Sequence, residues 1–368
     1  MTQTPQPSHP SGPSIDHFWA VVPAGGAGTR LWPLSRSSSP KFLHDLTGTG
    51  RTLIQATHDR LAPLVQDRIL VVTGRAHRDA VLEQLDVPAE AVLAEPSARD
   101  SMAAIGLAAA LLERRDPDAV MGSFAADHVI REPAVFHAAV ATAVDAARAG
   151  WLVTIGIEPT YAATGFGYIS AGDEVDGVPG TRVVREFVEK PDADVAATYV
   201  ADGYRWNAGM FIVRPTVLLD LLAETDPGFA ASLRAIAADP ATLEDAWDSL
   251  PRIAVDHAVA EPAAAAGRVA VVAGRFGWDD VGDFASLRSL LPAPDGELVV
   301  LGDRDRVRAI DSSGLVVPAG DRVVAVVGLE DVVVVDTGDA LLVTTRARAQ
   351  DVKSIVAALK EDGHVGLT

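Results

Sequence analysis

Short apolar runs alternate with longer amphipathic stretches up to about residue 160, and this alternation limits the possible folds more than any other feature. Each apolar run has strand length, and each stretch between two runs has the apolar spacing of a helix. Strands are expected at 18–22, 69–73, 92–94, 119–124 and 152–157, and helices at 53–64, 76–85, 101–114 and 133–149. The pattern predicts an α/β fold with a mostly parallel (Rossmann-like) mixed sheet and helices on both faces.

The pattern changes beyond about residue 160. Short strands are expected at 168–170 and 183–188 and helices near 195–199, 217–223 and 230–237; a Pro-rich stretch at 291–294 then marks a boundary. Val-rich strands at 298–301, 323–327, 332–335 and 341–343 and a final helix at 350–360 follow. We therefore expect a disordered lead at 1–17, an α/β domain at 18–290 and a C-terminal β domain with a final helix at 291–368. The residues alone fit either a solenoid stub or a closing sheet in this last part.

The chain is acidic, with 31 Lys and Arg against 50 Asp and Glu and a formal net charge of −19. Such a charge repels nucleic acids and anionic membranes, so any bound phosphate needs local cations, backbone amides or a metal. The absence of cysteine excludes disulfides, thiolate zinc sites and cysteine nucleophiles. The most apolar run, 103–112, is about half of the ~20 residues that a membrane-spanning helix needs. No secretion signal is visible at the N-terminus, so we expect a cytoplasmic protein without nucleic-acid or membrane partners.

A glycine-rich loop directly follows the first expected strand and reads PAGGAGTRL over residues 23–31. Glycines let the backbone approach a ligand and turn successive amides toward an anion. The loop lacks the Gly-Lys-Ser/Thr of a P-loop and the third glycine of a dinucleotide fingerprint. It ends instead in Arg30, and Lys41 follows after Pro40. A strand–turn–helix corner with a surface arginine is the alternative, but two cations behind the glycines favour a phosphate site.

The sequence GGAGTRLWP at 25–33, with Ser35-Arg36 and Pro40-Lys41 behind it, resembles the signature of the sugar-1-phosphate nucleotidyltransferases. The segment WPLSR at 32–36 is most similar to the sequences of the mannose-1-phosphate guanylyltransferases. Later segments match in the same order: FVEKP at 187–191, WNAGMF at 206–211, WDDVG at 278–282 and DTGDALLV at 336–343. The resemblance covers about residues 18–360, and its combination of motifs is specific although each motif alone is weak.

The resemblance implies an enzyme that makes GDP-mannose and pyrophosphate from GTP and α-D-mannose 1-phosphate, with Mg²⁺ as cofactor. It also implies a homodimer, a catalytic domain at 18–290 and a short left-handed β-helix-like domain behind it. An oxygen of the sugar phosphate attacks the α-phosphorus in line. Since that oxygen is already anionic, no general base is required. Such chemistry depends on positioning and charge neutralisation.

Five charged residues match the family's catalytic residues. The resemblance makes Asp127 and Asp280 metal ligands, Arg30 and Lys41 the cations on the triphosphate, and Lys190 the partner of the sugar phosphate. Asp127 ends an apolar run and Asp280 lies in a glycine-containing turn, and Mg²⁺ prefers one or two carboxylates plus substrate oxygens. The alternatives are a helix cap or turn acceptor for each aspartate and a solvated surface position for Lys190.

Further residues match binding positions of the family. The nucleotide-binding positions are Ala24, Gly25, Gly26, Gly28, Thr29 and Arg30. The sugar-binding positions are Gly167, Glu189, Lys190 and Asn207; a carboxylate and an amide suit sugar hydroxyls because they offer directional acceptors and donors. For His128, a structural role is the simplest interpretation.

Glu95 follows the strand expected at 92–94, where related thymidylyltransferases carry an amide that reads the base. Guanine offers two adjacent donors that one carboxylate accepts together, whereas uracil and thymine offer one. Glu95 is therefore our candidate for guanine selection, and a cap for the helix expected from Ser101 is its alternative. Asp100 stands where many family members have asparagine, and its role stays open.

Two other functions remain as alternatives. The first is a pyrophosphorylase for another pair, such as glucose 1-phosphate with UTP or dTTP. The second is a catalytically silent homologue that senses nucleotide sugars. Silent homologues usually lose a metal carboxylate or a phosphate cation, whereas this chain keeps all five charged residues, which favours an active enzyme.

Overall fold

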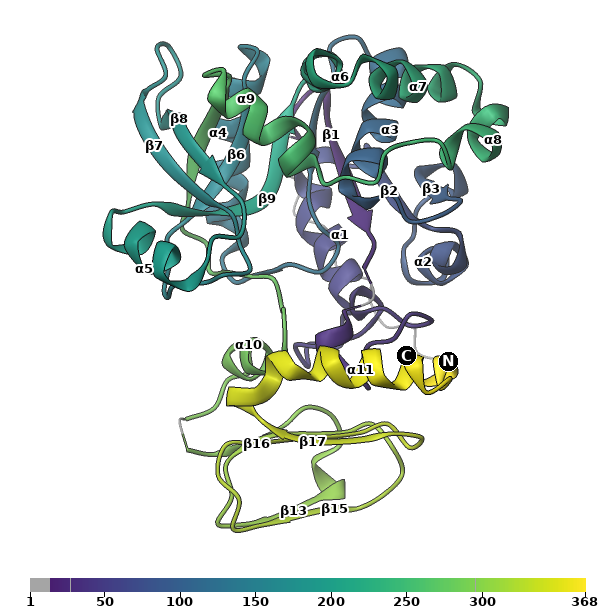
Figure 1. Ribbon diagram of the computed structural model, residues 1–368, viewed down its shortest axis with the longest axis vertical. Helices are drawn as coiled ribbons and strands as arrows, with labels where there is room; N and C mark the ends of the chain where they lie inside the picture. The colour runs from purple at the N-terminus through teal and green to yellow at the C-terminus, as the bar shows by residue number, and fades with distance from the viewer. Residues whose placement is uncertain (1–13, 27, 295) are drawn as a thin grey trace, which may run out of the picture.

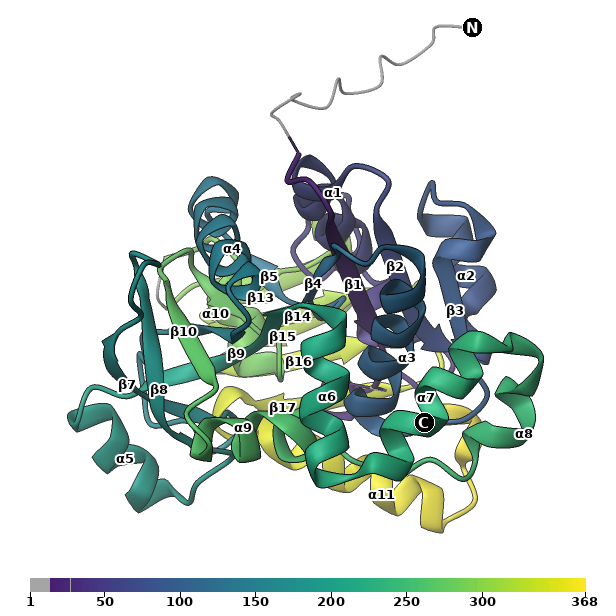
Figure 2. The same ribbon diagram turned by 90° about the horizontal axis from the view of Figure 1, so that it is seen from above.

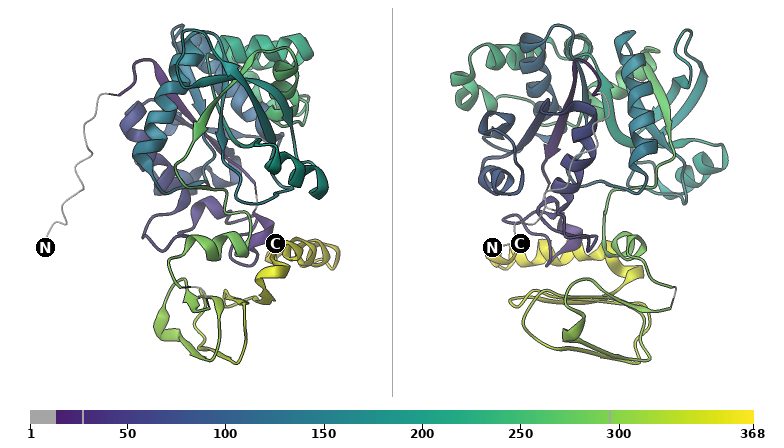
Figure 3. Two further views of the ribbon diagram at one scale, coloured as in Figure 1. Left: turned by 90° about the vertical axis from the view of Figure 1, so that its left-hand side faces the viewer. Right: turned by 180° about the vertical axis from the view of Figure 1, so that it is seen from behind.

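A computed structural model describes residues 14–26, 28–294 and 296–368, so most of the lead expected at 1–17 lies outside the described residues. A larger α/β unit lies on one side and a smaller β unit on the other, and helix α11 (Val352–Glu361) runs between them (Figures 1 and 3). Among the described residues, no helix is long and apolar enough to cross a membrane.

The larger unit is built on a nine-stranded sheet with the order β3-β2-β1-β4-β9-β6-β10-β8-β7. Strands β3, β2, β1 and β4 are parallel, whereas β9 runs antiparallel to both of its neighbours β4 and β6. The expected mixed α/β sheet is confirmed, and its continuous parallel part is confined to these first four strands. The strands are β1 Phe18–Ala24, β2 Ile69–Gly74, β3 Val92–Glu95, β4 Val120–Ser123, β6 Leu152–Ile157, β7 Tyr168–Glu174, β8 Thr181–Val188, β9 Arg205–Val213 and β10 Val269–Gly274.

Helices cover both faces of this sheet, as the alternating pattern predicts (Figure 2). Helices α1 and α4 pack on one face and α3, α6 and α7 on the other. Strand β1 is apolar throughout because Phe18 and Ala20 face one helical layer while Trp19 and Val21 face the other. The helices are α1 Leu53–Val65, α2 Arg78–Gln84, α3 Asp100–Arg115, α4 Pro133–Arg148, α5 Ala193–Ala201, α6 Pro215–Thr225, α7 Pro227–Ala238, α8 Leu243–Trp247, α9 Glu261–Ala265 and α10 Phe284–Leu290.

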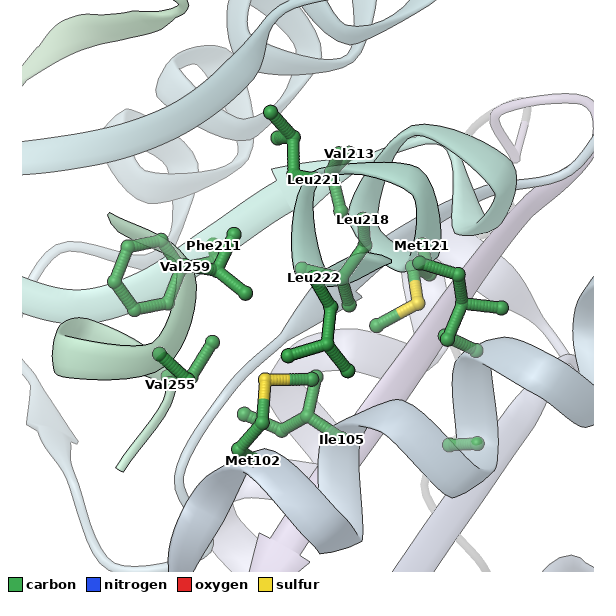
Figure 4. Packing of buried hydrophobic residues seen from close by; sticks show 14 of the residues in the cluster. Met102, Ile105, Met121, Phe211, Val213, Leu218, Leu221, Leu222, Val255 and Val259 are labelled. Atoms are coloured by element: carbon green, nitrogen blue, oxygen red, sulfur yellow. The ribbon is translucent and has the colours of Figure 1, made fainter. Parts of the chain in front are cut away.

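Figure 4 shows the packing on the second face. Met102 and Ile105 of α3 meet Leu218 and Leu222 of α6, and Met121 of β4 lies beside Leu218. These side chains are all buried. Burial of a side chain of this size contributes about 1.5–3 kcal/mol, so this layer fixes β4 and α3, whose ends border the site.

The smaller unit is a stack of parallel coils. Strands β12 (Leu298–Val300), β14 (Gly314–Pro318) and β16 (Val332–Asp336) lie in parallel register, as do β13 (Val307–Ile310) and β15 (Val324–Val327) on a second side. Strand β17 (Leu341–Thr345) closes the stack antiparallel to β16. The β-helix-like domain is therefore confirmed. Its close register requires glycine at 314, where φ is 125° and a side chain would clash with the backbone of Val332.

The two units meet behind the glycine-rich loop. Leu31 and Trp32 share one buried cluster with Val333 and Val352. The indole nitrogen of Trp32 donates to the carbonyl oxygen of Leu367 at 2.6 Å. The Arg36 guanidinium binds both carboxylate oxygens of Asp339 at 2.7 Å. Two motifs that are distant in sequence, WPLSR and DTGDALLV, thus hold the C-terminal unit against the loop.

Candidate active site

The glycine-rich loop leaves the carboxyl end of β1, where parallel α/β sheets bind their ligands. Ala24 ends the strand, and Gly26 and Gly28 have positive φ angles of 85° and 58°. A side chain at Gly28 would lie 2.8 Å from Ser35 Oγ and 3.2 Å from Lys41 Cβ, so glycine is required there. The predicted nucleotide-binding segment is thereby brought next to Lys41. Its last two residues, Thr29 and Arg30, lie in a 3₁₀ turn, η1 (Thr29–Leu31).

A short two-stranded ribbon brings the two predicted metal ligands together. Strands β5 (Val129–Ile130) and β11 (Trp278–Asp279) pair antiparallel, with Val129 opposite Asp279. Asp127 precedes β5 and Asp280 follows β11, so both residues lie at the same end of the ribbon.

Lys41 contacts both of these aspartates. Its ammonium lies 3.0 Å from Asp127 Oδ2 and donates to the backbone oxygen of Asp280 at 2.7 Å. The side chains of Lys41 and Asp127 are only 14% and 15% exposed. Burial raises the pKa of Asp280, and the charge of Asp127 adds to this effect, while Lys41 and Arg30 oppose it. The buried carboxylate of Asp280, with its raised pKa and with a second carboxylate nearby, favours the binding of a further cation.

This pair of carboxylates fits a divalent metal ion. Among the described residues, no group of three or more histidine, aspartate or glutamate side chains is placed to hold a metal. The protein could therefore offer Asp127 and Asp280, with the remaining positions left to water and phosphate oxygens, which is how Mg²⁺ is usually bound.

A cavity beside this pair is lined by three of the four predicted sugar-binding residues, all except Lys190. Strand β7 brings them together because Tyr168 pairs with both Val188 of β8 and Trp206 of β9. The residues next to these three in the sequence are Gly167, Glu189 and Asn207. These adjacent residues line the cavity together with Asp280. The cavity therefore connects the predicted sugar site to the predicted metal site.

Glu189 is placed to bind a ligand in this cavity. Its Oε2 is buried without a hydrogen-bond partner among the described residues, and its Oε1 lies 2.7 Å from Lys190 Nζ. A side chain at Gly167 would clash with Oε2, so the glycine leaves room for this oxygen at the wall of the cavity. Lys190 has a positive φ of 48°, and its side chain is 60% exposed although it is paired with Glu189.

Asn207 is held by a buried network that includes an acidic residue the sequence reasoning missed. Its Nδ2 donates to Asp256 Oδ1 at 2.8 Å, and its Oδ1 accepts from Thr154 Oγ1 at 2.8 Å. Burial, followed by the charge of Glu189, raises the pKa of Asp256 to about 6. Asp256 lines the same cavity and begins a π-helical turn, Asp256–Ala260. A single acid in front of an apolar run was the only sequence signal for it.

Glu95 ends β3, two strands away from the glycine-rich loop at the same edge of the sheet. Its Oε1 is buried without a partner among the described residues, and burial raises its pKa to about 7. The capping alternative is wrong, because the N-cap of α3 is Arg99 and no side chain caps this helix. Asp100 is the first residue of α3, with a φ of 61°, and lies 3.7 Å from Arg252.

His128 also lines the sugar cavity but has the features of a structural residue. Its ring packs edge to face on Trp278, with centroids 5.2 Å apart. Burial lowers its pKa to about 4, so the ring is neutral near pH 7.

A glycine-rich loop, neighbouring carboxylates and nearby cations at the carboxyl edge of a mixed α/β sheet are the arrangement expected of a nucleotidyltransferase. A family model described as nucleotidyl transferase matches residues 19–293, and one described as MannoseP isomerase/GMP-like beta-helix domain matches residues 305–359. The chain belongs to the mannose-1-phosphate guanylyltransferase family, as its relatives show.

The mannose-1-phosphate guanylyltransferase of Escherichia coli K12 is 39% identical over 361 residues, which are 94% of this chain and 74% of the relative. The xanthan biosynthesis protein XanB of Xanthomonas campestris pv. campestris is 40% identical over 354 residues, with coverage of 93% and 73%. A crystal structure from Thermus thermophilus, described as a mannose-1-phosphate geranyltransferase, superimposes with a TM-score of 0.85 at 34% identity and covers 94% of this chain and 99% of that one.

Proposed function

We propose that this chain transfers the guanylyl group of GTP to α-D-mannose 1-phosphate and releases GDP-mannose and pyrophosphate. The observation that carries the proposal is the position of Lys41 between Asp127 and Asp280, beside a cavity lined by Glu189, whose carboxylate pairs with Lys190. The relatives named mannose-1-phosphate guanylyltransferase support this choice of substrates.

The cations and amides of the site would bind the two polyanions. The amides of the glycine-rich loop, together with Arg30 and Lys41, would hold the triphosphate, and Lys190 would hold the phosphate of the sugar. Asp127 and Asp280 would hold Mg²⁺, which would neutralise charge on the triphosphate when bound. A phosphate oxygen of the sugar attacks the α-phosphorus, and the bond from this phosphorus to the bridging oxygen breaks. The electron pair leaves with pyrophosphate, so no proton has to move.

The sugar would bind between Glu189, Asn207 and the backbone at Gly167. Glu189 Oε2 has no partner among the described residues and is free to accept from a hydroxyl group. The amide oxygen of Asn207 already accepts from Thr154 and Gly209, and one of its two N–H groups is given to Asp256. Asn207 therefore has one N–H left to donate to the sugar.

Glu95 would select the base. In its ionised form, its carboxylate accepts both donors on the guanine edge, and those two charge-assisted hydrogen bonds would replace the water lost on burial. Uracil and thymine would leave one carboxylate oxygen without a partner in a buried site, which is costly.

A substrate panel tests the proposal. The purified chain is mixed with Mg²⁺, with mannose 1-phosphate or glucose 1-phosphate, and with GTP, ATP, UTP or dTTP; pyrophosphate release is coupled to a colour reaction and the nucleotide sugar is identified chromatographically. We expect the fastest release with GTP and mannose 1-phosphate. A faster reaction with glucose 1-phosphate and UTP or dTTP would establish the first alternative, and binding of GDP-mannose without turnover would establish the silent homologue. Light scattering on the same sample tests the predicted homodimer.

A further inference from the structure

A second cavity adjoins the sugar cavity and has a wall from the C-terminal segment. The two cavities share Gly165, Phe166 and Asp280. Arg30 and Asp283 line the second cavity from the α/β unit, and Gln350 and Lys353 line it from the chain that follows the β-helix-like domain. The predicted triphosphate cation Arg30 thus faces two side chains that lie more than 300 residues away in the sequence.

Gln350 connects Arg30 to a fixed point of the fold. Its Oε1 accepts from Arg30 Nη1 at 3.2 Å, and its Nε2 donates to Asp283 Oδ2. Asp283 is buried and caps α10 by accepting from the backbone amides of Ala285 at 2.7 Å and Ser286 at 3.0 Å. Because both ends of the Gln350 amide are engaged, it sets the direction of the Arg30 guanidinium, whose other N–H groups remain available for phosphate.

Apolar packing holds the C-terminal segment in this place. Val352 is buried in the same cluster as Leu31, which follows Arg30, and Val281, which follows Asp280. Helix α11 packs directly on η1. The position of the segment is therefore coupled to both the phosphate loop and the proposed metal loop.

Lys353 is exposed, lines this cavity and makes no ion pair with any described residue. A triphosphate or a departing pyrophosphate carries several negative charges close together, and cations aimed at this charge are the main contribution of the protein. The two acids of the cavity are engaged elsewhere, since Asp283 caps α10 and binds Gln350 and Asp280 belongs to the proposed metal pair. An unpaired ammonium beside Arg30 is thus suited to phosphate.

We propose that the C-terminal segment completes the triphosphate site: Lys353 binds the β- and γ-phosphates and the pyrophosphate they become, and Gln350 is a positioning residue for Arg30. The proposal rests on the nucleotidyl-transfer function proposed above. It gives the β-helix-like domain a role in substrate binding, because this domain supports the two residues at the edge of the cavity.

Binding of pyrophosphate and of GTP, each with Mg²⁺, is measured by calorimetry on the whole chain for Lys353→Ala and for the control Lys360→Ala, which changes an exposed lysine of the same helix outside the cavity. We expect Lys353→Ala to weaken both ligands about fivefold, which is about 1 kcal/mol, and to leave the KM for mannose 1-phosphate unchanged. Lys360→Ala should match the wild type. Equal pyrophosphate binding by the two variants would refute the role of Lys353.

Gln350→Ala and Gln350→Glu test the positioning role. The glutamate would bind Arg30 as an ion pair and repel both Asp283 and phosphate, so we expect it to weaken GTP binding more than alanine does. Equal GTP affinity of both variants and the wild type would refute the role of Gln350. Pyrophosphate contains neither sugar nor base, so its binding distinguishes a failure of the proposed substrates in the panel from a failure of this inference. If the panel shows another triphosphate as the substrate, that triphosphate replaces GTP in the Gln350 test.

Discussion

Replacing Glu95 by glutamine should stabilise the protein above neutral pH while it weakens the selection of GTP. Burial raises the pKa of Glu95 from its ordinary value of 4.5 to about 7. Between these pH values the folded state binds more protons than the unfolded state, so stability falls as the pH rises through this window. The loss is present in full above pH 7 and absent below pH 4.5. Glutamine has the same shape and no charge, so it avoids this loss.

The size of the effect follows from the difference in pKa. A tenfold difference in proton affinity corresponds to about 1.4 kcal/mol, so the shift of Glu95 amounts to at most about 3.5 kcal/mol at pH 8. Since water still reaches part of this side chain, we expect about 2 kcal/mol in favour of Glu95→Gln.

Urea unfolding at pH 4.5 and pH 8 measures this difference. The midpoint of Glu95→Gln should exceed that of the wild type at pH 8 and coincide with it at pH 4.5. Glu83→Gln, a change of an exposed residue in α2, is the matched control and should shift neither midpoint. A wild type that is equally or more stable than Glu95→Gln at pH 8 would show that the buried carboxylate is not the source of the penalty.

The ionisation of Glu95 should also make GTP binding depend on pH. Guanine donors bind only the ionised carboxylate, so the KM for GTP of the wild type should rise as the pH falls below 7. In Glu95→Gln the KM should be higher at pH 8 and should change less with pH. A preference for GTP over UTP and dTTP that survives the substitution would remove Glu95 from base selection.

Three further predictions concern the proposed metal site, the contact between the units and the sugar site. Asp280→Asn should lower kcat by about a hundredfold or more, as removal of a group that stabilises transition-state charge does. The melting temperature should not fall, because the substitution removes a buried charge beside Asp127. Unchanged turnover would exclude Asp280 from the proposed metal site. Arg36→Ala should destabilise the chain near pH 7, and its deficit in urea unfolding should shrink as the pH falls toward 2, because Arg36 lowers the pKa of Asp339 to about 2. Asp256→Ala should raise the KM for mannose 1-phosphate about tenfold, since a hydrogen bond to a charged group contributes ~1.5–3 kcal/mol, with the KM for GTP unchanged; equal changes in both KM values would contradict a role at the sugar.

The sequence predicted those parts of the fold that depend on local pattern. Strand β1 was visible because it is buried on both faces and therefore apolar at every position. Strand β9 was recognised only as a motif, because its residues 206–210 mix asparagine and glycine with apolar side chains. In the C-terminal unit the residues alone predicted the strands β12, β15, β16 and β17 but not their stacking into coils, since the register depends on Gly314 and on pairings between strands rather than on a repeated motif.

The residues of the site likewise divide into those that the sequence identified and those that required the structure. Resemblance to the family identified Lys41, Asp127 and Asp280, which the β5–β11 ribbon and the loop at Gly28 bring together. The environment of a residue is not visible in its neighbours along the chain. The buried and unpartnered carboxylate of Glu95 and the network around Asp256 therefore required the structure.

Packing of the C-terminal segment offsets backbone strain at the proposed metal site. Val281 has a φ of 50°, which is unfavourable for a β-branched residue and costs roughly 1–3 kcal/mol. Its side chain is fully buried in the cluster with Leu31 and Val352, and burial of a valine contributes about 1.5–3 kcal/mol, which offsets the strain. The turn that presents Asp280 is therefore held by apolar contacts from the segment that also presents Gln350. Because one cluster fixes both residues, the geometry of the proposed metal site and the direction of Arg30 depend on the same packing.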